Sequence, residues 1–539
     1  MKAFPFDSLR YSYPSRRNLV YGRKGMVATG NALAAQAGLD ALKSGGNAMD
    51  AAIAAAATLT VVEPVSNGLG SDAFCIIWKN GKLVGINGSG PAPMLASVEA
   101  LRQKGYTSMP QIGMHTVNVP GAVGVWEEVT AKFGKRTLAQ NLEAAISYAQ
   151  DGYVLQPNVA KEWQAEYKKY QALIAKNQDY QPWADTFAPE GKCLRAGDFL
   201  RLPDHAATLR AIAAGGADAF YRGEIAEKID AHFRRIGGFL RKEDLAAYHP
   251  EYVTPLSTNY CGYDVWELPP NGHGITVLMA LNILKEMEFG AENEFITVHR
   301  QIEALKLAYS DAKEYVADPR AMHVTPEEML SMDYAAERRG LITDKALLPV
   351  CGKPKKGGTV YLCTADGEGN MVSYIQSNYC GFGSGVVVPG TGIAFNNRGA
   401  NFTMDETKDN CIAPGKKSYH TIIPGFLTKD GEAVGPFGIM GGFMQPQAHV
   451  QVLNHLLRFG MNPQEALDHP RWMWTGGKTI EVEQSMDNRL CQELLRAGHD
   501  IVVKADSSEF GRGEMILRTE DGTLCGACEP RTDAVVAVW

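Results

Sequence analysis

The chain contains 539 residues, of which 45% are hydrophobic and 21% are charged, so it is long enough to bury a large core. Its formal net charge of -7 argues against a nucleic-acid partner, because such a partner favours a basic surface. The ten cysteines are scattered along the chain, which is typical of reduced thiols in a cytoplasmic protein.

Two segments decide the expected compartment. Residues 1–25 lack a continuous apolar stretch followed by a cleavage site of small residues, so they do not resemble a secretory signal. The most apolar run, residues 51–62, is too short to cross a bilayer and is interrupted by threonine. We therefore expect a cytoplasmic protein with no membrane partner.

The N-terminal part of the chain is predicted to begin with two helices. Residues 31–42 have helical periodicity and end before Ser44-Gly45-Gly46. Asn47 is a typical N-cap for a second, alanine-rich helix that fades before Pro64. Two strands and the turn that joins them are predicted to follow, at residues 73–78, 80–81 and 82–86.

The middle of the chain, from about residue 137 to residue 347, is predicted to be mainly helical and polar. Residues 298–316 have the pattern of an amphipathic helix that ends before Pro319. A loop rich in proline and glycine, residues 268–275, contains His273. A lone histidine in such a loop is more often structural, and a contact with a functional site is the less favoured alternative.

A short basic linker, residues 352–358, leads into a predicted β-hairpin. Residues 359–365 and 371–377 have strand character, and the turn cluster 366–370 joins them. Further strands and helices are predicted after the hairpin, at residues 385–397, 422–427, 434–439, 450–457 and 462–469. Because both halves of the chain contain strands and helices, the pattern alone predicts an α/β or α+β fold with two stacked sheets.

The junction between the linker and the hairpin suggests one particular chemistry. If the chain is cut between Gly358 and Thr359, Thr359 becomes an N-terminus that carries both a hydroxyl and an α-amine. A threonine hydroxyl is a poor nucleophile and needs an adjacent base. An α-amine with a pKa of about 7.7–8.0 can serve as that base. The alternative is that Thr359 is an ordinary β-branched residue that opens a strand.

Several motifs in the same order along the chain resemble those of a known family. They are residues 25–74 and the stretches GGTVYLCTADGEGNMVS, GFGSGVVVPGTGIAFNN, GIMGGFMQP and LCGACEPR. Together they resemble the two subunits of the γ-glutamyltranspeptidase family of N-terminal-nucleophile hydrolases. The resemblance implies an α+β fold of the four-layer αββα type. It also implies cleavage into a large subunit, residues 1–358, and a small subunit, residues 359–539, which stay together as a heterodimer. A higher oligomer is left open.

The resemblance assigns catalytic roles to four residues. Thr359 matches the nucleophile, which is also the point of autocatalytic cleavage after Gly358. Ser377 stands where relatives have a threonine that hydrogen-bonds the nucleophile, and it keeps the hydroxyl. Gly441 and Gly442 match the glycine pair whose backbone N–H groups form the oxyanion hole. The resemblance implies no cofactor and no metal.

The positions that bind substrate in the family differ in this chain. Asn87 replaces an arginine that holds the α-carboxylate of glutamate, and Asn401 replaces an aspartate that holds its amino group. His420 and Thr421 replace a pair of serines, and Arg398 stands where relatives have a glutamine. These departures weaken the case for a γ-glutamyl substrate.

Arg398 offers a way to compensate for the missing arginine. A guanidinium group can hold a carboxylate with two parallel hydrogen bonds. His420 and Thr421 could then add donors, and a carboxylate held nearer to Thr359 would favour a shorter acyl group. The alternative, with equal weight, is that Arg398 is a solvated surface charge.

The pattern QSNYxGFGSG…PGTGI…NRG…F includes Tyr379, a further candidate for substrate binding. It resembles a branch of the family that includes oxamate amidohydrolase, which implies hydrolysis of the small acidic amide oxamate to oxalate and ammonia during purine catabolism. Residues 402–418 are shorter than the lid loop of many relatives, which favours hydrolysis over transfer to an amine. Two alternatives stay open: a γ-glutamyltransferase or glutathione hydrolase with altered glutamate recognition, and a catalytically silent homologue.

Two further patterns carry no prediction of their own. Cys525 and Cys528 have CxxC spacing, but no second cysteine pair completes a zinc site, so we interpret them as incidental. The glycine loop at residues 381–385 lacks the Gly-Lys-Ser/Thr sequence of a phosphate-binding loop.

Overall fold

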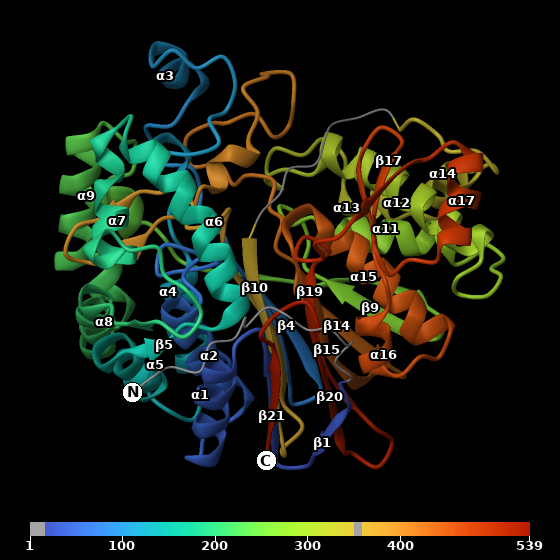
Figure 1. Ribbon diagram of the computed structural model, residues 1–539, viewed down its shortest axis with the longest axis horizontal. Helices are drawn as coiled ribbons and strands as arrows, with labels where there is room; N and C mark the ends of the chain where they lie inside the picture. Colours follow the sequence, from blue (N-terminus) through green and yellow to red (C-terminus); the bar gives the residue numbers. More distant parts are fainter. Residues whose placement is uncertain (1–16, 350–357) are drawn as a thin grey trace, which may run out of the picture.

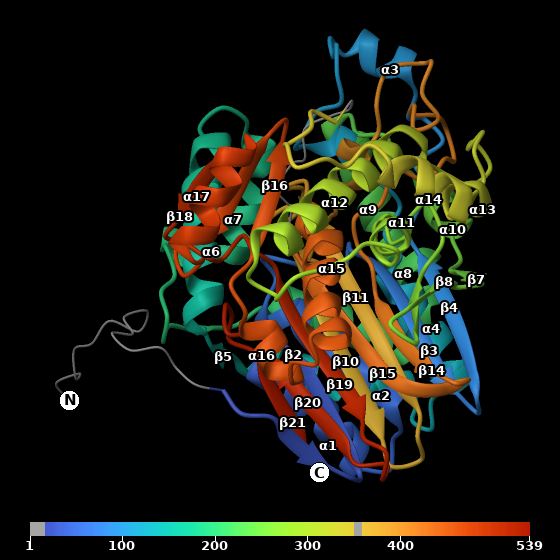
Figure 2. The same ribbon diagram turned by 90° about the vertical axis from the view of Figure 1, so that its right-hand side faces the viewer.

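The computed structural model describes residues 17–349 and 358–539, and it is built from four layers (Figure 1). Two seven-stranded sheets stack face to face in the middle, and helices cover the outer face of each sheet (Figure 2). This arrangement confirms the expected α+β sandwich of the αββα type. Residues 352–357 of the predicted linker and residues 1–16 lie outside the described ranges.

The first sheet carries the predicted hairpin at its centre. Its strands lie in the order β21-β2-β10-β11-β3-β4-β7, and every neighbouring pair is antiparallel. The strands are β21 (Val535–Val538), β2 (Gly25–Thr29), β10 (Gly358–Asp366), β11 (Met371–Tyr379), β3 (Asp72–Lys79), β4 (Lys82–Gly88) and β7 (Glu251–Val253). The hairpin strands β10 and β11 therefore have neighbours on both sides.

The second sheet has the order β1-β20-β19-β15-β14-β9-β8 and is also antiparallel throughout. Its strands are β1 (Val20–Gly22), β20 (Leu524–Cys528), β19 (Arg512–Arg518), β15 (Glu432–Met440), β14 (Gly425–Lys429), β9 (Tyr263–Glu267) and β8 (Leu256–Tyr260). Across the gap between the sheets, the ring of Trp78 on β3 stacks on Phe426 of β14. The ring of Tyr361 on β10 lies against Gly438 of β15, where a Cβ would come within 2.3 Å of it.

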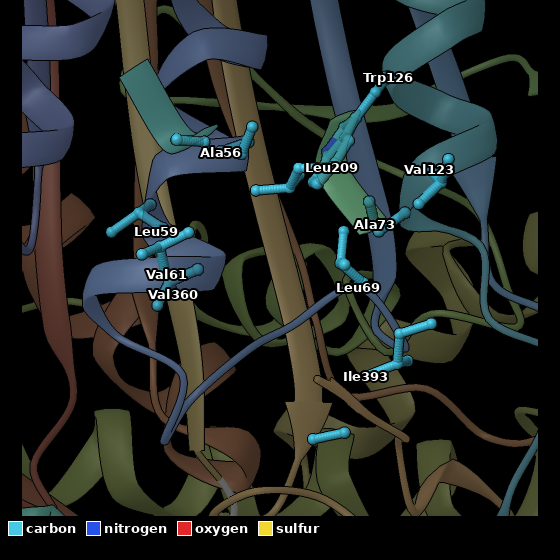
Figure 3. Close-up of a cluster of buried hydrophobic side chains, with 14 of the residues drawn as sticks. Ala56, Leu59, Val61, Leu69, Ala73, Val123, Trp126, Leu209, Val360 and Ile393 are labelled. Atoms are coloured by element: carbon cyan, nitrogen blue, oxygen red, sulfur yellow. The ribbon is translucent and has the colours of Figure 1, made fainter. Parts of the chain in front are cut away.

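One helical layer packs on the first sheet. It contains the two helices predicted near the N-terminus, and it consists mainly of α1 (Ala32–Lys43), α2 (Ala48–Val62), α4 (Ala122–Phe133), α5 (Leu138–Asp151), α6 (Pro157–Ile174), α8 (Pro203–Tyr221) and α9 (Glu224–Ile236). Every residue of α2 is buried, as its alanine-rich sequence requires for close packing. Figure 3 shows Leu59 and Val61 of α2 beside Val360 of β10 in the core of this layer.

The other helical layer packs on the second sheet. Its main helices are α11 (Ile275–Leu284), α12 (Phe295–Tyr315), α14 (Met332–Arg339), α15 (Gln445–Leu453), α16 (Pro463–Asp468) and α17 (Asn488–Ala497), and a small sheet of β16 (Trp472–Gly476), β17 (Thr479–Glu483) and β18 (Asp500–Lys504) lies beside them. α12 confirms the helix predicted at residues 298–316, but it is not amphipathic in the structure, because all of residues 301–312 are buried. Within residues 17–349 and 358–539, no helix is both long enough and apolar enough to span a bilayer.

Two predictions about secondary structure were wrong. The middle of the chain contains β7, β8 and β9, which have three to five residues each. β7 and β8 are edge strands with exposed polar side chains, whereas β9 lies between β14 and β8, and strands this short leave little periodicity in the sequence. Residues 385–397 do not form one strand, because Gly390 and Gly392 take positive φ values of 72° and 67° and turn the chain between β12 (Val387–Val388) and β13 (Ile393–Ala394).

The side chains of β10 alternate between two cores. Val360 and Leu362 belong to the core under α2, whereas Tyr361 and Cys363 belong to the core between the two sheets. This alternation directs Thr359 toward the gap between the sheets, on the side of Tyr361. The hairpin therefore presents its first side chain to the interior of the sandwich.

Asp366 fixes the far end of the hairpin. Its carboxylate accepts hydrogen bonds from the backbone N–H groups of Ala48, Glu368 and Asn370 and from the side chain of Asn370, at 2.8 to 3.1 Å. One of these donors is the first residue of α2, so the same carboxylate joins the hairpin to the helix behind it.

We expect Asp366→Ala to lower the free energy of unfolding by about 2–4 kcal/mol, because buried donors lose their charged acceptor. Chemical denaturation of the purified protein measures this change. Glu432→Ala, which removes a carboxylate with 79% of its side chain exposed, is the matched control and should change stability little. Equal effects of the two substitutions would contradict the prediction.

Candidate functional site

Thr359 and Ser377 lie side by side at one end of the first sheet. Oγ1 of Thr359 donates a hydrogen bond to Oγ of Ser377 at 3.1 Å, and the backbone N–H of Tyr379 donates to the same Ser377 oxygen at 2.8 Å. The pairing register between β10 and β11 shifts between Gly358 and Val360, so a β-bulge surrounds Thr359. Both hydroxyl-bearing side chains are fully buried. The fold thus brings together the two hydroxyls that the sequence assigned to one site.

Gly441 and Gly442 form the turn that follows β15 at the same end of the sandwich. Tyr361 of β10 lies against Gly438 of β15. Thr359 comes two residues before Tyr361, and Gly441 comes three residues after Gly438. Gly441 has a φ of 143° and Gly442 a φ of 58°, backbone angles that residues with a Cβ rarely adopt. This conformation explains the glycine pair and brings a bare backbone turn to the end of the sandwich where Thr359 lies.

Arg398 is fully buried, so the alternative of a solvated surface charge was wrong. Its Nε donates to Oδ2 of Asp72 at 3.1 Å, and Nη1 donates to Oγ1 of Thr421 at 2.8 Å. The guanidinium carbon lies 4.8 Å from the centre of the Tyr379 ring. The third nitrogen, Nη2, is buried and has no hydrogen-bond partner among the described residues.

Tyr379 links the arginine to the hydroxyl pair. Its backbone N–H contacts Ser377, its ring lies under Arg398, and its φ of 81° is unusual for a residue with a side chain. Backbone strain of this kind often accompanies functional sites. A single residue, Tyr379, therefore contacts both Arg398 and Ser377.

Asp72 is a member of the site that sequence reasoning missed. It pairs with Ser377 in the register of β3 and β11, and its Oδ2 accepts from both Arg398 and Nε2 of His420, the latter at 3.0 Å. Oδ1 accepts from the backbone N–H of Gly90 at 3.3 Å. The available signal was an aspartate at the start of an apolar strand, a position where a buried carboxylate needs a cation.

His420 is a neutral donor in this cluster. Nδ1 accepts from the backbone N–H of Ile422 at 3.4 Å, so Nε2 carries the proton that is donated to Asp72. Burial lowers the pKa of His420 to about 4, with a further contribution from the charge of Arg398 and a partial offset from Asp72. Phe74 stacks on the imidazole ring. The side chain is thus held by its neighbours on both edges and one face.

Asn87 and Asn401, the two other substrate-binding candidates, have different surroundings. The amide nitrogen of Asn87 donates to Asn271 at 2.9 Å, and its oxygen accepts from the backbone and side chain of Ser89. Its hydrogen-bonding capacity is therefore used within the protein. Nδ2 of Asn401, in contrast, is buried and has no hydrogen-bond partner among the described residues.

His273 contacts aromatic side chains behind the site. Its Nδ1 lies 3.0 Å from the hydroxyl of Tyr419, and its ring meets those of Tyr309 and Phe443 edge-on. Burial lowers the pKa of His273 well below its usual value. These contacts fit the structural interpretation of this histidine.

Residues 402–418, expected to be a short lid, pack beside α3 (Val98–Gln103). Phe402, Met404 and Ile412 share a small apolar core with Leu101 of that helix, as the neighbouring segments in Figure 1 illustrate. The segment therefore has a core of its own. Whether its short length favours hydrolysis stays a prediction.

A cavity of about 460 Å³ opens beside Gly441. It lies between α6, the turn after β15 and the strand β16, and Cys380 and Gly381 at the end of β11 also line it. Tyr170 of α6 donates to the carbonyl of Gly381 at 3.1 Å, which holds this helix against the chain that follows Tyr379. The lining residues Cys380 and Gly381 thus follow Ser377 by three and four positions along the chain.

One buried cluster has the composition of a metal site, with His299, Glu303 and His499 as its members. Nε2 of His299 donates to a backbone carbonyl, so its Nδ1 accepts from His499 at 2.9 Å. Lys306 lies 2.7 Å from Glu303 and 3.4 Å from the other nitrogen of His499. Because an ammonium group occupies the middle of the cluster, we interpret it as a hydrogen-bonded chain that holds α12 in place.

Cys525 and Cys528 do not form a redox or metal pair. Both lie on β20, where residues three apart point to opposite faces. Both thiols are free, and burial raises the pKa of each. The interpretation of the CxxC spacing as incidental fits this geometry.

Comparison with known proteins gives the family. A family model described as Gamma-glutamyltranspeptidase matches residues 34–539. The chain is 35% identical over 529 residues to the glutathione hydrolase-like YwrD proenzyme of Bacillus subtilis, with 95% of this chain and 98% of that protein covered. It is 34% identical over 527 residues to the oxamate amidohydrolase proenzyme of Klebsiella pneumoniae, with the same coverage.

A solved structure described as cephalosporin acylase from Bacillus halodurans matches with a TM-score of 0.96 and 54% identity, and 99% of each chain is covered. The proenzyme relatives imply a precursor that processes itself into two subunits, which remain together as a heterodimer. The chain therefore belongs to the γ-glutamyltranspeptidase family, and it is a self-processing amidohydrolase of the N-terminal threonine type.

Proposed function

We propose that the chain cleaves itself between Gly358 and Thr359, and that the mature enzyme hydrolyses the amide of a small acid, with oxamate as the simplest substrate. The large subunit would be residues 1–358 and the small subunit residues 359–539. The observation that carries the proposal is the buried hydroxyl pair of Thr359 and Ser377, connected through Tyr379 to a buried guanidinium with a free N–H group.

Self-cleavage needs no group beyond these residues and water. Oγ1 of Thr359 attacks the carbonyl carbon of Gly358, a C–O bond forms, the C–N bond breaks, and the nitrogen becomes the α-amine after taking up the hydroxyl proton. Water then hydrolyses the ester, which leaves a carboxylate on Gly358 and restores the hydroxyl. Ser377 orients the attacking oxygen through their hydrogen bond of 3.1 Å.

Turnover repeats the same chemistry on a substrate. The new α-amine accepts the proton of Oγ1 as this oxygen attacks the amide carbonyl. The backbone N–H groups of Gly441 and Gly442 stabilise the oxyanion, a contribution of about 10²–10³ in rate for each donor. The amine product leaves with the proton, and water hydrolyses the acyl-threonine ester.

The buried donors near Arg398 favour an acidic acyl group. Nη2 of Arg398 and Nδ2 of Asn401 have no hydrogen-bond acceptor among the described residues. A substrate carboxylate would supply acceptor oxygens for both nitrogens. We propose that His420 and Thr421 act indirectly, because the contacts of both side chains hold Asp72 and Arg398 in position.

The same cluster disfavours a substrate with an α-amino group. Asp72 is the carboxylate that contacts Arg398, and its oxygens already accept from Arg398, His420 and Gly90. An ammonium group would have to displace one of these donors. A γ-glutamyl donor is therefore the less favoured alternative, and family membership together with the hydroxyl pair argues against a silent homologue.

The similarity to the cephalosporin acylase structure favours a second candidate, an acylase that releases a larger amine than ammonia. The cavity beside Gly441 supports this candidate, because hydrolysis of oxamate alone requires no such space. The two candidates agree on the acyl-transfer chemistry and differ in the amine that leaves.

Thr359→Ala should remain a single polypeptide of full length and should lose amidase activity, because the attacking oxygen is absent. Denaturing electrophoresis and ammonia release from oxamate measure the two effects. Thr364→Val is a matched control, since Thr364 lies on the same strand and its hydroxyl bonds the carbonyl of Ala48 on the helical side. Cleavage of the Thr359 variant at the same bond would refute the proposal.

Arg398→Lys should lower kcat/KM for oxamate about 10–100-fold while it changes the value for the neutral diamide oxamide much less. The lysine keeps a charge beside Asp72 but loses the N–H group offered to the carboxylate, an interaction of about 1.5–3 kcal/mol. Complete self-cleavage of the variant verifies its fold. Arg489→Lys, at a side chain that is 86% exposed, is the control. An unchanged ratio of oxamate to oxamide hydrolysis would reject the assignment.

The matured enzyme should release ammonia from oxamate faster than it releases aniline from a γ-glutamyl anilide, because Asp72 already accepts hydrogen bonds from Arg398, His420 and Gly90. Parallel assays at equal substrate concentration compare the two rates. Faster aniline release would favour the γ-glutamyltransferase alternative.

A further inference from the structure

The cavity beside Gly441 lies on the other side of Thr359 from Arg398. In the first sheet, β11 separates Thr359 on β10 from Asp72 on β3, so the arginine cluster is on the β3 side. The cavity is lined instead by Met440 at the end of β15 and Arg512 at the start of β19. β15 faces β10 through the contact of Tyr361 with Gly438, whereas β3 faces β14.

This placement separates the two halves of an amide substrate. The reacting carbonyl must lie at Thr359, with the acyl group extending in one direction and the amine in the other. If the acid end of the acyl group contacts Arg398, the amine is directed toward the cavity. The volume of about 460 Å³ is that of a small-molecule site and far exceeds what ammonia needs.

Part of the cavity lining is apolar. It consists of thioether and aromatic side chains: Met440, Phe443, Met444, Met473 and Trp474. Methionine side chains adapt to irregular shapes, and aromatic rings offer flat apolar surface and faces that attract cations. Lys313 already lies 5.3 Å from the ring centres of both Phe443 and Trp474, which illustrates that attraction.

The lining also contains acidic side chains. Four carboxylates line the cavity, from Glu162, Glu166, Glu481 and Glu509, against two cations, Lys169 and Arg512. Lys169 pairs with Glu166 at 2.7 Å, and Arg512 pairs with Glu162. These two cations are thus engaged with two of the carboxylates, and Lys504 lies 3.7 Å from a third, Glu481, so four carboxylates face three cations and a small excess of negative charge remains.

Three residues that line the cavity have a buried polar atom without a hydrogen-bond partner among the described residues. Oγ of Ser66, a residue with 1% of its surface exposed, and Nε of Arg512, with 7% exposed, have no hydrogen-bond partner among the described residues. Oε2 of Glu481 also has none, and its other oxygen lies 3.7 Å from Lys504. Buried polar atoms are nearly always paired, so a ligand or water is expected here.

We propose that this cavity receives the leaving amine, and that the preferred amine has an apolar chain and a second, cationic group. The substrates would then be N-substituted amides of a small acid, and amines with a carboxylate would be poor leaving groups because the lining repels them. This inference rests on the proposed function for the acyl half of the substrate. Hydrolysis breaks the C–N bond, adds water, and releases the acid and the amine without redox chemistry.

Three oxamates with matched chains test the inference: N-butyl, N-(4-aminobutyl) and N-(3-carboxypropyl) oxamate. We expect kcat/KM to rise at least about 10-fold from the carboxypropyl to the aminobutyl compound. The butyl compound should lie between them and above oxamate itself. Equal values for the three chains, or a preference for the carboxylate, would overturn the inference.

Glu481→Gln locates the effect, because it removes one negative charge at nearly constant size. It should reduce the preference for aminobutyl over carboxypropyl about 5–10-fold. Glu432→Gln, at an exposed carboxylate on the far end of β15, is the matched control and should leave the preference unchanged. A preference that Glu481→Gln leaves intact would place the recognition elsewhere and reject this cavity.

Binding of the free amines separates this inference from the proposed acyl chemistry. Calorimetry with the matured enzyme should show 1,4-diaminobutane binding more tightly than butylamine, and 4-aminobutyrate least tightly, with the first affinity lowered in Glu481→Gln. If these amines bind in that order but no oxamate is hydrolysed, the proposed acyl group is wrong and the cavity assignment stands. If oxamate is hydrolysed and the amines show no such order, the cavity assignment is wrong.

Discussion

The hydrogen bond between Thr359 and Ser377 is the interaction on which the proposed chemistry depends. It joins the first residue of the proposed small subunit to the neighbouring strand, inside the gap between two sheets. The register of β10 against β11 and β2 fixes where Thr359 stands, and Asp366 fixes the far end of the same strand. A rigid sandwich thereby holds a flexible hydroxyl in one place, which is the condition for efficient intramolecular attack.

Burial of Arg398 imposes a second constraint. A guanidinium without water is costly unless its donors are satisfied and its charge is balanced. Asp72 supplies the balance, and His420 stays neutral because its pKa is about 4. One nitrogen of the guanidinium remains without an acceptor. An incompletely satisfied buried cation is difficult to explain as a purely structural element, and it is easier to explain as a site that awaits an anion.

Much of the fold could be read from the sequence because its strongest signals are local. The hairpin around Asp366, the capped helix after Asn47 and the helix α12 each have a periodicity or a turn residue that acts within a few positions. The strands β7 to β9 were missed because strands of three to five residues leave little pattern. The order of strands in the two sheets is set by contacts between distant segments, which a single sequence does not record.

The site shows the same division. Family resemblance named Thr359, Ser377 and the glycine pair, whereas Asp72 was missed because its role depends on Arg398, a residue 326 positions away. The burial of Arg398 could not be predicted either, since a lone arginine in a glycine-rich loop has no periodicity that would indicate it. Sequence patterns therefore pointed to the proposed reacting groups but not to the buried charges that surround them.

The interleaving of strands has a consequence for the molecule once its chain is cut. In the first sheet, β10, β11 and β21 belong to the part of the chain after the proposed cleavage point, whereas β2 and β3, which pair with them, come before it. The second sheet is mixed in the same way. Neither fragment contains a complete sheet or a closed core. Separation of the pieces would require global unfolding, so the nicked protein should behave as one cooperative body even at high dilution. Breaking one covalent bond thus frees a terminus without creating two independent molecules.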